Sequence, residues 1–233
     1  MKELPILFST PMVQAMLDGR KTMTRREVKS THHGWDCQKM NFTQSRNIDK
    51  SEITEKYKRQ ASQIVGFHAF FTDEELNGHQ LGIKCPFGQP GDILWVRESF
   101  SIWLDAIKFK ADGEQVIKGF KYKPSIHMPK DHARIWLQVE EIKVERLHEI
   151  SEDDAISEGV LKHKDGKHWL NYIVQKYHTS QFIYCLHTAR LSFFSLWQIL
   201  ANEKSLMPRN NPWVWVVKFK VLSTTGRPET LNN

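Results

Sequence analysis

The sequence predicts a single α+β domain built on a mixed β-barrel of about five to six strands, with flanking helices and two insertions. The candidate elements run in the order strand, helix, strand, insertion, several strands, short helix, longer helix and final strand. This order disfavours the regular strand–helix alternation of a doubly wound parallel sheet. A composition of 40% hydrophobic and 26% charged residues excludes wholesale disorder. We predict one domain over residues 1–222 and a flexible polar tail over 223–233.

The first 26 residues predict a strand, a helix and a second strand. An apolar run at 6–8 is typical of a short strand, and Thr10 is placed to cap a helix with Pro11 in its first turn. Gly19 is suited to end that helix in a left-handed conformation. The chain then enters a basic, strand-like segment at 20–26, Arg-Lys-Thr-Met-Thr-Arg-Arg.

The middle of the chain predicts further strands. A turn-rich segment leads into a strand at 93–98, and the lysine-rich residues 108–130 predict a hairpin that turns near Asp112 and Gly113. A long strand follows over 134–147. The apolar residues change parity at 140–141, which predicts a β-bulge or bend.

The C-terminal third predicts two helices and a last strand. Ser151 is placed to cap a short helix that ends at Gly159. A helix over 190–201 is expected to bury Phe193 and Trp197, and a strand is expected from Trp213 onward. In that strand, the tryptophans fit core positions better than stacking positions.

Two polar stretches interrupt this pattern, at about 29–83 and 161–188. Both lack a periodic apolar face, so we interpret them as insertions. Residues 50–59 are expected to form a charged helix within the first of them.

The formal net charge of +6, with eight Trp and thirteen Phe, suits a nucleic-acid partner and equally suits plain solubility. No apolar run reaches the roughly 20 residues of a membrane span, and the N-terminus lacks the apolar core of a signal peptide. Three widely separated cysteines predict neither a disulfide framework nor a cysteine zinc site. We therefore expect a cytoplasmic protein without a membrane or obligate protein partner.

The sequence contains no P-loop, GxGxxG, GxSxG or HExxH motif, so the nucleotide-binding, hydrolase and metalloprotease classes that carry them are disfavoured. His163 and His168 lie five residues apart without a third ligand nearby in the sequence. We therefore expect no metal and no cofactor.

Three segments are candidates for chemistry. Clustered cations around Lys21 would lower the pKa of a desolvated amine and make it a usable base; the alternative is a solvated or phosphate-contacting basic strand. Glu158, at a helix C-terminus, is placed for acid–base chemistry or is a plain exposed helix end. His127 is either a catalytic or base-contacting residue or a hydrogen-bonded structural group.

Read together, several segments resemble the ASCH superfamily, and most closely its bacteriophage and prophage members. The resemblance is carried by the sequence at 5–26, 91–98, 123–129, 146–159 and 211–216. It implies a PUA-like β-barrel with flanking helices. The superfamily includes amidohydrolases that deacetylate N4-acetylcytidine, enzymes that cleave RNA, and members proposed to bind RNA.

For an amidohydrolase, the resemblance implies that Lys21, Thr24 and Glu158 are the catalytic residues. A regular strand would place Lys21 and Thr24 on opposite faces, so this site requires a bulge or a strand that starts after Lys21. The residues assigned to binding a nucleoside or nucleic acid are Arg20, Arg25, Arg26, Arg97, Glu98, His127 and Arg134.

Two functions follow from these segments. The first is a hydrolase of a modified nucleoside or RNA in a bacterial or phage-infected cell. The second is a non-catalytic module for RNA or single-stranded DNA, or a ribonuclease that uses the same basic cleft. The chain is about twice as long as the small amidohydrolases and has Arg25 where they have an apolar residue, so the resemblance does not by itself assign the substrate.

Overall fold

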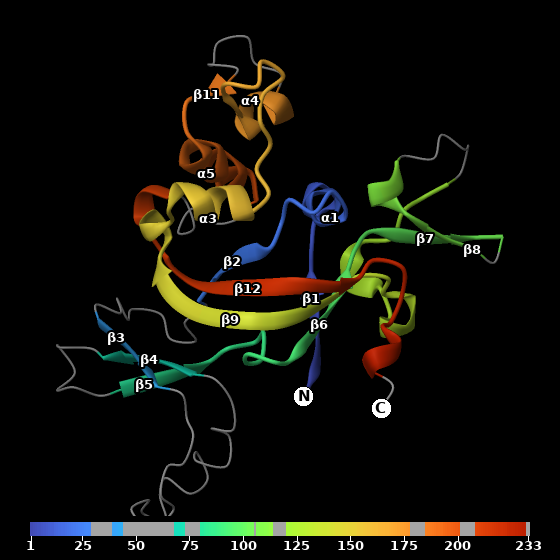
Figure 1. Cartoon of the computed structure of the whole chain (residues 1–233), viewed down its shortest axis with the longest axis horizontal. Helices are drawn as coiled ribbons and strands as arrows, with labels where there is room; N and C mark the ends of the chain where they lie inside the picture. The colour runs from blue at the N-terminus through green and yellow to red at the C-terminus, as the bar shows by residue number, and fades with distance from the viewer. Residues whose placement is uncertain are drawn as a thin grey trace, which may run out of the picture.

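The chain is described by a computed structural model (Figure 1). The description covers residues 1–28, 39–43, 68–72, 80–104, 106–113, 120–177, 185–200 and 208–231. Within 39–43, 68–72 and 80–82 it extends to the backbone alone.

A five-stranded mixed sheet forms the centre of the molecule, in the order β1-β6-β9-β12-β2. Its strands are β1 (Glu3–Leu7), β2 (Met23–Glu27), β6 (Ile93–Arg97), β9 (Trp136–Arg146) and β12 (Trp213–Ser223). The β1–β6 pair is parallel and the other pairs are antiparallel. The α+β class is therefore confirmed.

The two longest strands, β9 and β12, curve strongly across the molecule (Figure 1). Their register shifts by one residue where Lys218 faces Glu141 and Phe219 faces Val139, which leaves Glu140 as the extra residue. This confirms the bulge predicted from the change in parity, because an extra residue moves the following side chains to the other face.

The described strands do not close into a barrel, because no ladder of backbone hydrogen bonds joins the edge strands β1 and β2. A side chain connects them instead. The guanidinium of Arg26 in β2 donates through Nη2 to the carbonyl oxygen of Leu7 at the end of β1. The curvature of the sheet thus brings its two edges together at this end.

Both faces of β12 are buried, which explains its nearly continuous apolar sequence. Trp215, Val217 and Phe219 pack in the core cluster that contains residues of α1 (Thr10–Leu17). Val214 and Val216 pack in a second cluster, with residues of α3 (Glu152–Ser157) and α5 (Ala189–Leu200). Trp215 therefore belongs to the core, as predicted, and Trp213 is partly buried against the same cluster.

The predicted helix ends are largely confirmed. Ser151 Oγ accepts the N–H of Asp154 at 3.0 Å and caps α3. Gly19 follows α1 with a φ of +71°. The predicted cap of α1 is wrong by one residue, because Ser9, with an extended backbone, is the N-cap and Thr10 is the first residue of the helix.

The predicted insertions contain secondary structure of their own. In the first lie β3 (Lys39–Thr43), β4 (His68–Thr72) and β5 (Gln80–Lys84), a separate antiparallel sheet. The second contains β10 (Trp169–Leu170), α4 (Tyr172–Tyr177) and β11 (Cys185–Leu186). The charged helix predicted at 50–59 lies outside the described residues.

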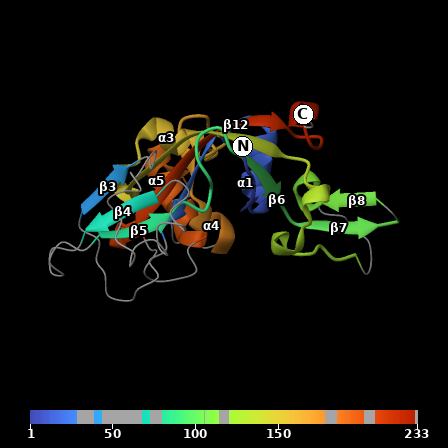
Figure 2. The ribbon, with the colours of Figure 1, turned by 90° about the horizontal axis from the view of Figure 1, so that it is seen from below.

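The predicted hairpin at 108–130 is wrong in position. β7 (Phe100–Trp103) pairs with β8 (Ala106–Phe109) around Leu104, which has a φ of +47°. Asp112 instead ends a short 3-10 helix. The turn lacks a glycine, so the sequence contains no residue of this type to indicate a turn at this place. This hairpin and the β3–β5 sheet project from opposite ends of the central sheet (Figure 2).

The segment predicted as a flexible tail packs onto the domain as far as residue 231. Leu231 is buried in a cluster with Ile93 and Trp136, and Arg227 pairs with Glu3 at 2.7 Å. Every helix in the described part of the chain falls short of the length and apolarity of a membrane span.

Candidate active site

Lys21 lies in the connection between α1 and β2, before the strand begins at Met23. Its backbone N–H donates to the carbonyl of Ala15 at 3.0 Å, and the next N–H, of Thr22, donates to the carbonyl of Ser157 in α3 at 2.9 Å. These bonds hold the connection between two helices. Because Lys21 precedes the strand, the alternation of side chains along a regular strand does not force Lys21 and Thr24 onto opposite faces.

The Lys21 side chain is 1% exposed, and its ammonium has two oxygen partners on one residue. Nζ donates to Glu158 Oε2 at 2.7 Å and to the Glu158 carbonyl at 2.9 Å. Burial lowers the pKa of Lys21, against the opposing effect of the Glu158 charge. The desolvated amine expected from the sequence is therefore present.

Glu158 is the C-terminal cap of α3 and is only 4% exposed, so the alternative of an exposed helix-end glutamate is wrong. Gly159 follows with a φ of +88°, and a Cβ there would lie 2.8 Å from Ala15 Cβ and 3.0 Å from Lys21 Cβ. Glycine at this position thus permits both the helix end and the close approach of Lys21.

Arg25 joins three carboxylates around the same buried centre. Its Nη2 lies 2.6 Å from Glu145 Oε1 and 2.7 Å from Asp154 Oδ2, and its Nη1 lies 3.4 Å from Glu158 Oε1. Burial opposes the charge of Arg25, but the charges of Glu158 and Glu145 outweigh it, so the pKa of Arg25 is raised. A guanidinium with these partners orders Glu158.

Thr24 is fully buried, and its Oγ1 has no hydrogen-bond partner among the described residues. It lies in β2 opposite Val217. The structure therefore brings Lys21 and Glu158 into contact but leaves Thr24 without a hydrogen bond to either. A buried hydroxyl without a partner is uncommon and marks a position for a role beyond packing.

A pocket of about 130 Å³ adjoins this centre. Its polar lining residues are Glu158, Glu27, Arg25 and Arg26, and its apolar lining includes Met12 of α1 with Phe193 and Trp197 of α5. Lys21 and Thr24 do not line the pocket. Glu158 is therefore the group that connects the buried lysine to the space a ligand would occupy.

Two other arginines of the basic segment lie at the edge of this region. Arg26 stacks over the Phe8 ring at 5.0 Å, in addition to its bond to Leu7, and burial lowers its pKa. Arg20 is 30% exposed and donates to the Gly159 carbonyl at 2.6 Å. Both side chains thus have partners within the fold.

The remaining predicted binding residues form a separate group. Glu98 is 1% exposed and accepts two hydrogen bonds from Arg134, from Nε at 2.9 Å and Nη2 at 3.0 Å. Desolvation raises the pKa of Glu98, against the effect of Arg134. Arg97 donates to the carbonyls of Met128 and Ile126, and His127 is exposed. These interactions order the loop at 125–132.

Sequence reasoning did not single out Glu145 and Asp154 as members of the site. Both contact Arg25 from elements distant in sequence, β9 and α3. The local sequence around a carboxylate does not indicate which distant residue it pairs with, so only the fold identifies Glu145 and Asp154 as partners of Arg25.

A second group of polar side chains has ligand atoms suitable for a metal: Asp165, His168 and Cys185 lie within 4.8 Å of one another. The sequence spacing of the histidines did not indicate this group.

No protein-family model, curated protein or solved structure matches the chain.

Proposed function

We propose that the chain is a hydrolase directed at a modified nucleoside or RNA, most specifically an amidohydrolase that deacetylates an N4-acetylcytidine-type nucleoside. The main support for this proposal is the buried contact of Lys21 with Glu158, a carboxylate that lines a pocket. The curved five-stranded sheet with flanking helices supports the ASCH resemblance and its PUA-like fold as part of the same proposal.

The mechanism assigns proton transfer to the Lys21–Glu158 pair. Glu158, which lines the pocket, accepts a proton from the attacking water, and Lys21, whose pKa is lowered by burial, orders this carboxylate through their hydrogen bond. Water adds to the acetyl carbonyl, and the proton returns through Glu158 to the leaving amine, so that acetate and cytidine are released. Thr24 belongs to this proposal through the resemblance alone, because its buried hydroxyl has no hydrogen-bond partner among the described residues and it does not line the pocket.

The pocket supplies the other two requirements of such a reaction, which are stabilisation of the oxyanion and binding of the base. Arg26, which lines the pocket and whose Nε has no hydrogen-bond partner among the described residues, provides an N–H donor for the oxyanion that develops on the carbonyl oxygen. Phe193 and Trp197 provide aromatic side chains against which a pyrimidine base can stack. The lining of one pocket thus contains groups for electrostatic stabilisation and for base binding.

The test is incubation of the purified chain with N4-acetylcytidine, with release of acetate and cytidine as the readout. Lys21→Met and Glu158→Gln should each lower kcat/KM by about 10²-fold or more, the usual range for loss of an acid–base group. Glu141→Gln, which changes an exposed glutamate of β9, is the matched control. Absence of product from the wild-type chain would exclude this substrate.

A second candidate function is binding of single-stranded nucleic acid without catalysis, favoured by the surface around the β7–β8 hairpin. Trp103, Phe120 and Tyr122 form consecutive ring contacts, with centroids 5.5 Å and 4.9 Å apart. Lys108 and Lys123 are exposed nearby in the sequence. Aromatic rings with cations are typical of surfaces that bind single strands.

Binding of this kind is tested by titrating a fluorescent single-stranded oligonucleotide at several salt concentrations. The affinity should fall steeply with salt. Lys108→Ala and Lys123→Ala should each reduce the salt slope by about one, because each removes a cation that neutralises one phosphate. Salt-dependent binding by a wild-type chain that releases no acetate from N4-acetylcytidine would separate the second function from the first.

A further inference from the structure

The segment between α3 and α5 brings together metal-ligating side chains from two places in the sequence. A tight turn over 163–168 is closed by the N–H of His163 donating to the carbonyl of His168 at 2.8 Å. The next residues, Trp169 and Leu170, form β10 and pair with Leu186 and Cys185 of β11. The antiparallel register places Cys185 beside the strand that begins at the turn.

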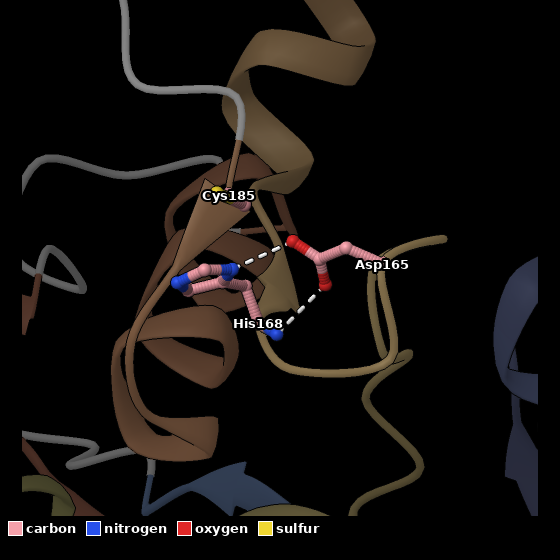
Figure 3. Close-up of side chains that lie close together, drawn as sticks. All are labelled: Asp165, His168 and Cys185. Carbon is pink, nitrogen blue, oxygen red and sulfur yellow. Dashed lines mark hydrogen bonds and ion pairs between the residues drawn. The ribbon is translucent and has the colours of Figure 1, made fainter.

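Asp165 is the centre of this arrangement. Its Oδ2 lies 2.6 Å from His168 Nδ1, and its Oδ1 accepts the backbone N–H groups of Lys167 and His168, each at 2.9 Å (Figure 3). The backbone bonds hold the carboxylate in a single orientation. They also lower the pKa of Asp165, which keeps it ionised.

Cys185 approaches the same point from β11. Its sulfur, an Asp165 oxygen and a His168 nitrogen all lie within 4.8 Å of one another. Cys185 is a free thiol and is partly buried. Tetrahedral zinc, at about 2.0–2.3 Å from each ligand, places ligand atoms about 3.3–3.8 Å apart. Binding therefore requires Asp165 Oδ2 and His168 Nδ1, now 2.6 Å apart, to separate, while the sulfur of Cys185, within 4.8 Å of both residues' ligand atoms, needs to move by no more than about 1 Å.

A fourth ligand is available from the turn itself. His163 Nδ1 lies 3.3 Å from Asp165 Oδ2. This nitrogen is shielded from solvent, and its contact does not meet hydrogen-bond geometry. A rotation of the imidazole would complete a site of two nitrogens, one oxygen and one sulfur. His187, whose ring packs edge-on against His168 at 5.2 Å, is a neighbour of the site.

We propose that Asp165, His168 and Cys185, with His163 as the fourth ligand, bind a structural zinc ion. Imidazole, thiolate and carboxylate are the ligands that zinc takes, and hard cations such as magnesium disfavour the thiolate. The ion links the turn at 163–168 to β11. Without it, this part of the chain is joined to β11 by the two residue pairs of β10. The ion lies just before the start of α5, and its role is to stabilise this segment.

The site is tested with the full chain, purified without a histidine tag, by measuring bound metal. We expect one equivalent of zinc by elemental analysis. After removal by a chelator, Co²⁺ should restore the visible bands of a tetrahedral site and a sulfur-to-cobalt charge-transfer band. Wild-type chain that takes up no zinc, or gives an octahedral cobalt spectrum, would overturn the proposal.

Variants assign the ligands. Cys185→Ser should abolish the charge-transfer band, and His168→Ala and Asp165→Asn should weaken zinc affinity by more than about 100-fold, beyond the effect of residues that only support a ligand. His163→Ala should behave like them. His187→Ala is the matched control within the same segment, and a larger loss from it than from His163→Ala would overturn the choice of fourth ligand.

Because a ligand variant can lose its local fold, X-ray absorption at the zinc edge of the wild-type chain provides an independent readout. The expected first coordination sphere contains one sulfur and three nitrogen or oxygen atoms. A sphere without sulfur would exclude Cys185 and with it the proposed site. Neither measurement depends on hydrolysis of a nucleoside.

Discussion

The Nζ of Lys21 lies 2.7 Å from Oε2 of Glu158, 137 positions further along the chain, and the two side chains are 0% and 3% exposed. The ion pair joins the start of β2 to the end of α3. A buried pair of this kind contributes little net stability compared with apolar residues, but the loss of one partner leaves the other without compensation. The pair is therefore a sensitive point of the fold as well as of the proposed chemistry.

Replacement of Glu158 should destabilise the chain. Glu158→Gln removes the negative charge between Lys21 and Arg25, and we expect the free energy of unfolding to fall by about 3–5 kcal/mol. Chemical denaturation followed by circular dichroism measures this change. Glu141→Gln, at an exposed position, should change it by less than about 0.5 kcal/mol. Equal effects of the two variants would contradict the buried pairing.

Arg25 should not be replaceable by lysine. An ammonium cannot reach Glu145 and Asp154 together with the geometry of the guanidinium, so Arg25→Lys leaves a buried carboxylate unpaired, at a cost of about 1–3 kcal/mol or more. The matched control is Arg227→Lys, where an arginine that is 44% exposed pairs with Glu3. That change should cost less than about 1 kcal/mol. Similar thermal midpoints for both variants would refute the prediction.

Substitution of two glycines by alanine allows the stability cost of backbone strain to be compared with the cost of steric conflict. Gly19 and Gly159 both have positive φ, of +71° and +88°, but only at Gly159 does an added Cβ meet other atoms. Gly19→Ala should cost about 1–2 kcal/mol from backbone strain alone. Gly159→Ala should cost about 1–3 kcal/mol more, because Ala15 and Lys21 must move. Urea unfolding of the two variants measures the difference, and equal costs would exclude the close approach.

The lowered pKa of Lys21 predicts a pH dependence of stability. Between this pKa and the ordinary value of 10.5, the unfolded chain binds more protons at Lys21 than the folded chain. The free energy of unfolding therefore rises with pH through that window and is unaffected by Lys21 below it. The difference between wild type and Lys21→Met, measured by urea unfolding at neutral and alkaline pH, should grow toward pH 10.5. A difference independent of pH would contradict the shift.

The thiols should differ in reactivity. Burial raises the pKa of Cys85 to about 12, and its side chain is 3% exposed, so little thiolate is present at neutral pH. Cys185 is partly exposed. In the native, metal-free chain an alkylating reagent should modify Cys185 well before Cys85, as mapped by peptide mass spectrometry. After denaturation both should react, and native labelling of Cys85 at the same rate would refute the prediction.

Much of the central fold follows from local patterns in the sequence. The change of parity at Glu140 predicted the bulge, and Ser151 predicted the start of α3, because both signals depend on residues close in the chain. The hairpin around Leu104 was missed because its turn has no glycine. The strands at 39–84 were missed although β3 and β5 alternate polar and apolar residues, because each is only five residues long and lies in a long polar stretch.

The sequence by itself determined the residue types of the site: a lysine after a helix end and a glutamate before a glycine, each with local chemistry that favours a functional role. Only the tertiary structure decided that these two side chains meet, that Arg25 joins Glu145 and Asp154, and that Asp165 and His168 lie beside Cys185. The physical reason is that capping and periodicity act over a few residues. Charge pairing and ligand geometry depend on atoms brought within a few ångströms by the packing of distant elements.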